Sequence, residues 1–233
     1  MSVQTSEQVL IDGAAVALDV RVNRRARRIS LRVDSGSGGI VLTLPNDRAR
    51  AEGLRFAAEK ADWIRANLAA LPARVPFAPG AVLPLLDVPH RIAHRPDGRA
   101  GVWAEAGEIR VSGQAEHLPR RLGDWLKAEA RRIIVPRAHA AARQLDRRIA
   151  RISIRDTRSR WGSCSHAGAL SFSWRLLLAP EPVLDYVVAH EAAHLVEMNH
   201  SRRFWRLVDE VCDARADAER WLRRHGPTLH RYG

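Results

Sequence analysis

The chain has 233 residues, with 38 lysines and arginines against 26 aspartates and glutamates, which gives a formal net charge of +12 at pH 7. Its apolar fraction of 46% is ordinary for a soluble globular protein. No stretch approaches the roughly 20 apolar residues of a membrane span, so we expect no membrane association. The length suits one large domain or two small ones.

Charge and cysteine content bear on partners and compartment. A basic surface attracts nucleic acid, anionic lipid or an acidic substrate. The densest basic cluster, residues 21–28, contains no aromatic residue to stack on bases, so nucleic acid is a weakly supported partner. Residues 1–13 lack the features of a signal peptide, and the two cysteines, Cys164 and Cys212, form no disulfide framework. We therefore expect a reduced, cytoplasmic protein.

The first half of the chain is predicted to be rich in strands. Residues 8–45 contain alternating or β-branched segments separated by turn residues. Residues 46–71 predict one helix, which Asn46 or Asp47 would cap. After a connector rich in proline, residues 81–113 predict short strands, including a hairpin that turns at Ala106-Gly107.

A long helix is predicted over residues 118–145. Pro136 lies in the middle of this segment and is expected to kink or split the helix. The candidates for its buried side are Trp125, Ala128, Ile133 and Leu145.

Beyond this helix the pattern alternates between strand and helix. Residues 151–157 predict a strand, residues 158–168 a loop, and residues 169–178 a second strand that would lie beside the active site. A helix is expected over residues 180–195, with proline and acidic residues in its first turn. Residues 201–225 predict one or two further helices.

The sequence His190-Glu191-Ala192-Ala193-His194 carries the strongest chemical signal. Positions four apart on a helix lie nearly above one another, so His190 and His194 would project from one face and could hold one ion. Glu191 lies one step round the helix, where it could accept a proton from water at the ion's open position. This is the HExxH arrangement, which predicts two zinc ligands and a general base.

A catalytic zinc site usually has a third protein ligand. Glu197 would share the face of His194 only if the helix continued. His200 would reach the ion if the helix broke near Met198-Asn199, and we favour it because asparagine tolerates the left-handed conformation that ends many helices. Ser201 would then cap the next helix. A pair of buried structural histidines remains the alternative to a metal site.

Three motifs follow one another in residues 158–205. They are RWGSCS, then ALSFSWRLLL, then DYVVAHEAAHLVEMNHSRRFW. In order and spacing they closely resemble the core of the YgjP-like metallopeptidase family, which is related to the SprT and WLM groups. The resemblance implies an α+β fold, in which a β-rich N-terminal half packs with a helical, zincin-like C-terminal half that carries HExxH on a helix. We place these parts at residues 1–115, with one helix, and residues 116–233.

The resemblance also implies a set of functional residues. His190, His194 and His200 would be ligands of Zn²⁺, and Glu191 would be the base. The four weaker candidates for substrate binding match the RxRWGS motif: Arg158, Arg160, Trp161 and Ser163. The competing interpretation is that the tryptophan and serine build a turn and that the arginines pair with nearby acidic groups.

The predicted function is that of a zinc-dependent metallopeptidase, in which Glu191 activates a zinc-bound water to cleave a protein or peptide substrate. Some members of the family carry a nucleotide pyrophosphohydrolase label, so metal-dependent hydrolysis of nucleoside triphosphates is an alternative. That chemistry usually uses Mg²⁺ held by oxygen ligands, and the chain has no GxxxxGK[ST] loop. A DNA-associated zinc protein is a second alternative, against which an open site with an intact Glu191 argues.

Overall fold

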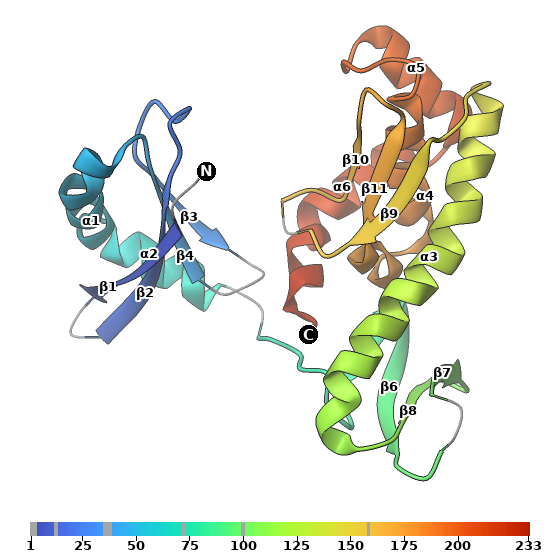
Figure 1. The fold of residues 1–233 in the computed structure, drawn as a ribbon, viewed down its shortest axis with the longest axis horizontal. Coiled ribbons are helices and arrows are strands. Elements are labelled where there is room, and N and C mark those ends of the chain that lie inside the picture. Colours follow the sequence, from blue (N-terminus) through green and yellow to red (C-terminus); the bar gives the residue numbers. More distant parts are fainter. Residues whose placement is uncertain (1–3, 12–13, 35–38, 71–72, 99–100, 158) are drawn as a thin grey trace. The chain divides into compact units, whose positions relative to one another are not determined.

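A computed structural model describes residues 4–11, 14–34, 39–70, 73–98, 101–157 and 159–233. The chain divides into two compact units, Met1–Ala73 and Arg74–Gly233, each described here by itself (Figure 1). Strands dominate the N-terminal half and helices the C-terminal half, so the α+β class is confirmed. None of the helices in the described ranges combines the length and apolar character needed to cross a membrane.

The first unit is a four-stranded sheet with two helices. The strand order is β1-β2-β4-β3, and only the β2–β4 pair is parallel. The strands are β1 (Gln4–Ile11), β2 (Ala14–Val22), β3 (Ser30–Asp34) and β4 (Gly39–Leu44). The core consists of Leu18, Val20, Ile40, Leu42, Leu44, Ala57 and Ile64.

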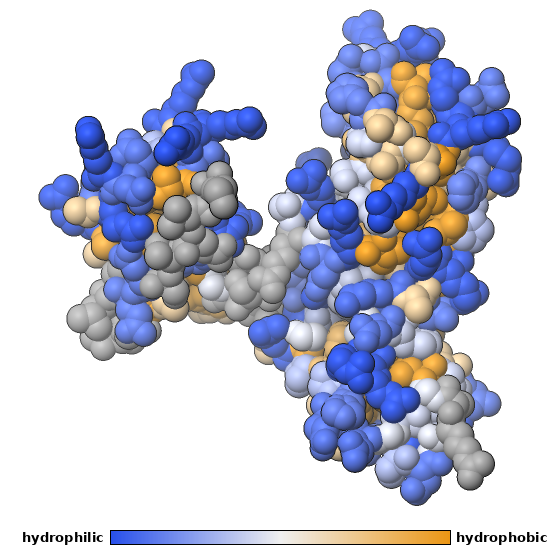
Figure 2. All heavy atoms as spheres, viewed as in Figure 1, coloured by the Kyte–Doolittle hydropathy of each residue, from blue (hydrophilic) through white to orange (hydrophobic). Residues whose placement is uncertain are grey.

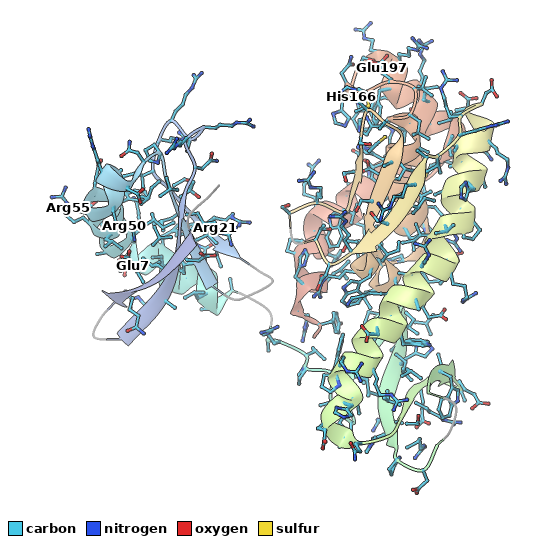
Figure 3. All side chains as sticks on the ribbon, in the orientation of Figure 1. Glu7, Arg21, Arg50, Arg55, His166 and Glu197 are labelled. Carbon is cyan, nitrogen blue, oxygen red and sulfur yellow. The ribbon has the colours of Figure 1, made fainter. Side chains whose placement is uncertain are left out.

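The expected single helix of this unit is two helices, α1 (Arg50–Glu59) and α2 (Ala61–Ala69), after the short 3₁₀ helix η1 (Asp47–Ala49). Lys60 separates them with a φ of −97° and a ψ of 21°, outside the helical region. Asn46 caps the segment as predicted, because its side chain accepts a hydrogen bond from the Ala49 amide at 3.1 Å. Arg50 ties α1 to β1 through an ion pair with Glu7 (Figure 3).

The second unit begins with another four-stranded sheet, of order β5-β6-β8-β7. The strands are β5 (Val82–Leu85), β6 (Val88–Arg95), β7 (Val102–Glu105) and β8 (Glu108–Ser112). The predicted hairpin is confirmed: Ala106 and Gly107 have φ angles of 51° and 77°. Two consecutive positive φ angles are typical of a type I′ turn, whose twist matches that of the strands it joins.

Helix α3 (Leu118–Gln144) is 27 residues long, follows the 3₁₀ turn η2 (Ala115–His117) and contacts both sheets of the second unit (Figure 1). It continues through Pro136, so the expected split is wrong. Of the expected buried side, Leu145 is buried, but Ala128 is exposed, and Trp125 and Ile133 are only half-buried. The side that is buried follows a spacing of about four: Leu118, Leu122, Leu126, Ala130, Ile134, Ala138, Ala141 and Ala142.

The third sheet has the order β10-β11-β9. Its strands are β9 (Arg151–Arg155), β10 (Gly162–Cys164) and β11 (Ala169–Ser173); β9 is parallel to β11 and β10 is antiparallel to it. Two expectations need correction. The loop predicted over residues 158–168 contains the edge strand β10. The strand predicted over residues 169–178 ends at Ser173, whose hydroxyl caps the 3₁₀ helix η3 (Trp174–Leu178).

The chain ends in helices α4 (Glu181–Ala193), α5 (Arg202–Val211) and α6 (Arg215–His225), followed by the 3₁₀ helix η4 (Gly226–Arg231). Figure 1 shows α3 running beside α4, and the two are in contact. Hydrophobic residues gather over β9 and α3 on the face drawn in Figure 2. Between these two elements Val135, Ile149 and Ile154 line a shallow hollow.

The boundary predicted at residue 115 lies inside the second unit. Leu83 and Ile109, from the β5–β8 sheet, belong to the same hydrophobic core as α3 and α4. A strand-rich segment therefore packs with helices that follow it in the chain, and composition alone does not reveal that grouping.

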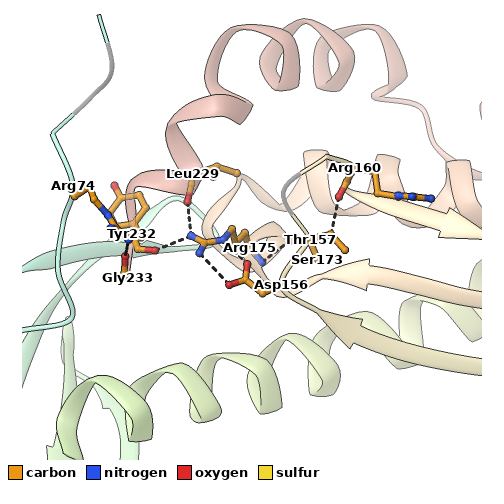
Figure 4. A network of polar contacts seen from close by, with 9 residues as sticks. All are labelled: Arg74, Asp156, Thr157, Arg160, Ser173, Arg175, Leu229, Tyr232 and Gly233. Atoms are coloured by element: carbon orange, nitrogen blue, oxygen red, sulfur yellow. Dashed lines mark hydrogen bonds and ion pairs between the residues drawn. The ribbon is translucent and has the colours of Figure 1, made fainter. Parts of the chain in front are cut away.

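Arg175 joins the end of the chain to the third sheet (Figure 4). Its buried guanidinium donates to Asp156 at 2.8 Å and to the carbonyl oxygens of Leu229 and Tyr232 at 3.1 and 2.7 Å. The adjoining Tyr232 pairs with Val75 in a parallel bridge. One buried cation therefore ties together the chain after β9, the 3₁₀ helix η3 and η4.

Replacing Arg175 with Ala should lower the free energy of unfolding by about 3 kcal/mol, because two backbone carbonyls and a carboxylate lose a charged donor. Asp156→Asn is the matched control, since the Asp156 side chain is 43% exposed against 8% for Arg175. It should cost about 1 kcal/mol or less. Urea denaturation of both variants measures the difference, and equal losses would contradict the central role of Arg175.

Candidate metal centre

Helix α4 places His190 and Glu191 in the interior of the second unit. Nearly every side of the helix is buried, and Glu191 itself is only 6% exposed. A helix buried on all sides must be apolar nearly throughout. The polar groups that remain on it are therefore held in a dry environment, in which their chemistry is altered.

The helix ends two residues before the expected end at residue 195 and well before the expected break near Met198-Asn199. Its last residue is Ala193, and His194 is the C-cap. The non-glycine residues with positive φ in the described ranges do not include Asn199, so the expected left-handed end is wrong. Instead, the Asn199 side chain accepts a hydrogen bond from the Ser201 amide at 3.0 Å, and His194 Nδ1 lies 3.0 Å from the Glu197 carbonyl oxygen. These local bonds fold the chain back after α4.

The reversal brings His200 to the other two histidines. One ring nitrogen from each of His190, His194 and His200 lies within 4.8 Å of the others, and the Nε2 atoms of His190 and His200 are 3.2 Å apart. Two nitrogens bound at about 2.05 Å to a tetrahedral zinc would be roughly 3.3 Å apart. The donor set therefore fits one zinc ion. Glu197, the alternative ligand, is not in this group; Figure 3 shows it at the end of the unit beside α5.

Aromatic rings pack against the three imidazoles. Phe204 is fully buried, and its ring centre lies 4.5–5.0 Å from those of the three histidines. Trp205 stacks on His200 at 5.6 Å, and the Arg215 guanidinium lies 5.1 Å from the Trp205 ring. Ser201 places both aromatic residues, because its hydroxyl caps α5 by accepting a hydrogen bond from the Phe204 amide, as predicted.

A hydrogen-bond chain reaches the far side of His190. Its Nδ1 lies 3.5 Å from the Tyr186 hydroxyl, which donates to Glu219 Oε1 at 3.0 Å. Since Nε2 of His190 faces His200, Nδ1 is left to face Tyr186. Outer hydrogen bonds of this kind orient metal-binding imidazoles and fix their tautomer. The sequence contained a signal for Tyr186, which lies four residues before His190 on the same helix face, but Glu219 is brought in only by the fold.

Burial, followed by the charges of His194 and His200, lowers the pKa of His190 to about 4. Burial also lowers the pKa of His194. Both rings are therefore neutral at neutral pH. A neutral imidazole is the form that offers a lone pair to a metal ion.

The same burial acts in the opposite direction on Glu191, since an acid is charged when deprotonated. It raises the pKa of Glu191 to about 7, and the charge of Arg160 partly opposes the rise. The carboxyl group lies against β10, where a Cβ on Gly162 would be 2.5 Å from Glu191 Cγ and Oε1. Only glycine leaves room for the acid at this point of the edge strand. Sequence reasoning treated the glycine as part of a loop.

Cys164, on the same strand, is not part of the histidine group. Burial, followed by the charge of Glu191, raises the pKa of its thiol to about 11. The thiol is therefore protonated at neutral pH and does not supply a thiolate ligand. Both cysteines are free, as expected.

Comparison with known proteins agrees with this arrangement. A family model described as YgjP-like, metallopeptidase domain, matches residues 27–225. The chain belongs to the YgjP-like metallopeptidase family. Membership supports a metal-dependent peptidase acting on protein or peptide substrates.

Other comparisons add little to the family assignment. The crystal structure of the metallopeptidase zymogen of Pyrococcus abyssi abylysin is 22% identical and covers 40% of this chain and 94% of that chain, with a TM-score of 0.36. A likeness at that level carries no argument about this YgjP-like chain. No curated protein matches it.

The remaining predicted site residues of this YgjP-like protein are the four candidates for substrate binding that match the RxRWGS motif. Arg158 lies outside the described residues. Arg160 is exposed, and its side chain points away from the Arg175 network (Figure 4). Trp161 stacks on His230 at 5.1 Å, a packing contact. Ser163 is on the edge strand β10.

The raised pKa of Glu191 makes stability depend on pH. A carboxyl group with a folded-state pKa of about 7 and an ordinary value of 4.5 stabilises the fold while it is protonated. That contribution is complete below about pH 4.5 and is lost as the pH rises through 7. For metal-free protein, the free energy of unfolding relative to Glu191→Gln should fall by about 3 kcal/mol between pH 4 and 8. Urea denaturation with a chelator present measures this, and a flat difference would contradict the burial of the acid.

Proposed function

We propose that this chain is a zinc-dependent metallopeptidase in which His190, His194 and His200 hold the ion and Glu191 is the general base. The observation that carries the proposal is the approach of one ring nitrogen from each of three imidazoles to within 4.8 Å of the others, next to a buried carboxyl group. Three histidines with one position left open are typical of catalytic rather than structural zinc.

Zinc bound there would polarise the scissile carbonyl and make a water molecule acidic enough to attack it at neutral pH. Glu191 supplies the proton transfers. Its carboxylate accepts the proton of the attacking water and returns it to the leaving amine. A pKa of about 7 suits both steps, because the group is readily deprotonated and readily reprotonated at neutral pH.

The edge strand β10 supports a peptide rather than a small-molecule substrate. It pairs with β11 on one side and flanks Glu191 through Gly162. An extended peptide can add to a free strand edge through its own backbone hydrogen bonds. A peptide bound along β10 would run past the carboxyl group of Glu191. We therefore assign the binding of an extended peptide to β10. The sequence had instead placed residues 169–178 beside the active site.

Hydrolysis of nucleoside triphosphates is the alternative that an assay must separate from this proposal. Phosphoryl chemistry relies on Mg²⁺ held mainly by oxygen ligands. The proposed donor set consists of three ring nitrogens. Parallel assays on unfolded protein, peptides and nucleoside triphosphates therefore decide between the two activities.

Glu191→Gln should retain one zinc per chain and lose peptide cleavage by at least about 100-fold, since general-base catalysis contributes that much or more. His190→Ala or His200→Ala should lose the metal itself. Metal analysis alongside the parallel assays measures both effects. Triphosphate cleavage that vanishes in Glu191→Gln, with no peptide cleavage in the wild type, would replace the proposal by its alternative.

Gly162→Ala should lower kcat while leaving the zinc content unchanged. The added methyl group would overlap the Glu191 carboxyl group and displace it, and a shift of about 1 Å costs roughly 100-fold. Gly123→Ala is the control, since a Cβ there meets only Phe77 at 3.8 Å. Full activity in Gly162→Ala would show that Glu191 is not the base in the position described here.

A further inference from the structure

A hollow of about 490 Å³ lies over the third sheet. Twelve of the described residues line it, and none of these is acidic or aromatic. The strands contribute hydroxyl and guanidinium groups to it, because side chains two apart on a strand share a face. In register across the sheet lie Ser163, Ser171 and Ser153.

Arginines border the row of serines. Arg151 and Arg155 flank Ser153 along β9, and Arg160 precedes the edge strand β10. All three arginines are exposed. Arg151 and Arg155 are four residues apart on one strand, which separates their Cα atoms by about 13 Å. The hollow is thus bordered by cations over a length that matches four residues of an extended peptide.

Within the described part of the chain no carboxylate pairs with Arg151 or Arg155, whereas the charge of Arg160 acts on Glu191. No ion pair joins Arg151, Arg155 or Arg160 to any residue there. Elsewhere in the same unit Arg137 pairs with two carboxylates, and Arg215 pairs with Asp209. An unbalanced group of cations attracts anions, and the overall charge of +12 adds to that attraction.

The hollow and the candidate base lie on opposite faces of β10. A Cβ on Gly162 would meet the Glu191 carboxyl group, and its strand partner Phe172 is buried, whereas the next residue, Ser163, belongs to the row of serines that faces the hollow. An occupant of the hollow therefore lies on the outer face of the sheet, across the edge strand from the position at which a peptide bond would be cleaved.

We propose that this hollow, lined by Arg151, Arg155, Arg160 and the three serines, binds an acidic segment of the protein substrate. The inference rests on the proposed function and adds a substrate class to it. Carboxylates of the segment pair with the guanidinium groups, and the serine hydroxyls donate to its remaining oxygens. The spacing of the arginines suits side chains of an extended peptide. The absence of aromatic lining residues disfavours a single-stranded nucleic acid, whose bases need stacking partners.

The test is a binding measurement that requires no turnover. Fluorescence anisotropy would compare a labelled peptide rich in glutamate with the same peptide carrying glutamine, using zinc-loaded Glu191→Gln protein. The double variant Arg151→Gln/Arg155→Gln is made in that background, and Arg160 is left intact because it acts on residue 191. Arg91→Gln is the matched control, an exposed arginine on β6 in a different sheet.

The acidic peptide should bind about tenfold more tightly than the glutamine peptide, and the double variant should remove that preference. The preference should weaken with salt and survive Arg91→Gln. Equal binding of both peptides, or a preference that the double variant retains, would overturn the proposal. Stronger binding of a single-stranded oligonucleotide that the double variant abolishes would assign the hollow to nucleic acid instead.

The outcome for this hollow is separable from that for the peptidase. Charge-selective binding with no cleavage of any peptide by the wild-type protein would contradict the proposed function and leave an acidic-peptide site. Peptide cleavage dependent on Glu191 without charge selectivity would overturn the hollow's assignment alone.

Discussion

Burial of α4 on nearly every side is the constraint on which the second unit depends. The helix carries only a few polar groups inward, and each of them needs a partner or must remain neutral. Helix α3 covers it along one side, the third sheet approaches it through β10, and α5 and α6 close the rest. The long α3 is thus more than a connector, because it unites the β5–β8 sheet with the elements that surround the histidines.

One physical cause sets the protonation of the candidate ligands and of the candidate base together. Removal from water disfavours charge, so it keeps His190 and His194 neutral and holds Glu191 close to half-protonated at neutral pH. No separate interaction is needed to set the protonation of each of these side chains. On the outer side of His190, burial alone would leave a ring nitrogen without a partner. The Tyr186 hydroxyl lies at that nitrogen and is itself held by a hydrogen bond to Glu219.

The sequence predicted local features better than the architecture, for reasons that particular residues make plain. The spacing of His190 and His194 is a local property of a helix, and Ser201 as a cap and Ala106-Gly107 as a turn are local as well. The end of α4 was misjudged because it depends on the bonds made by Asn199 and on the His194–Glu197 contact, which form only once the loop has closed. The role of β10 was missed because three residues give no periodic signal, and the space that Gly162 leaves is visible only against Glu191.

The exposed arginines of the third sheet differ in role from the buried arginine of the same unit. Within the same unit, Arg175 is buried and fully engaged by Asp156 and two carbonyl groups, so its charge stabilises the fold. Arg151 and Arg155 contribute nothing comparable, because they lie exposed on an edge strand without a carboxylate partner among the described residues. The second unit pairs Arg137 with two acids and leaves Arg151 and Arg155 without an ion pair among the described residues, so some of its arginines stabilise the structure and others are available to a ligand. Composition gives only the formal net charge of +12 and does not distinguish these two kinds of arginine, because the distinction depends on which acidic residues the fold brings close to each.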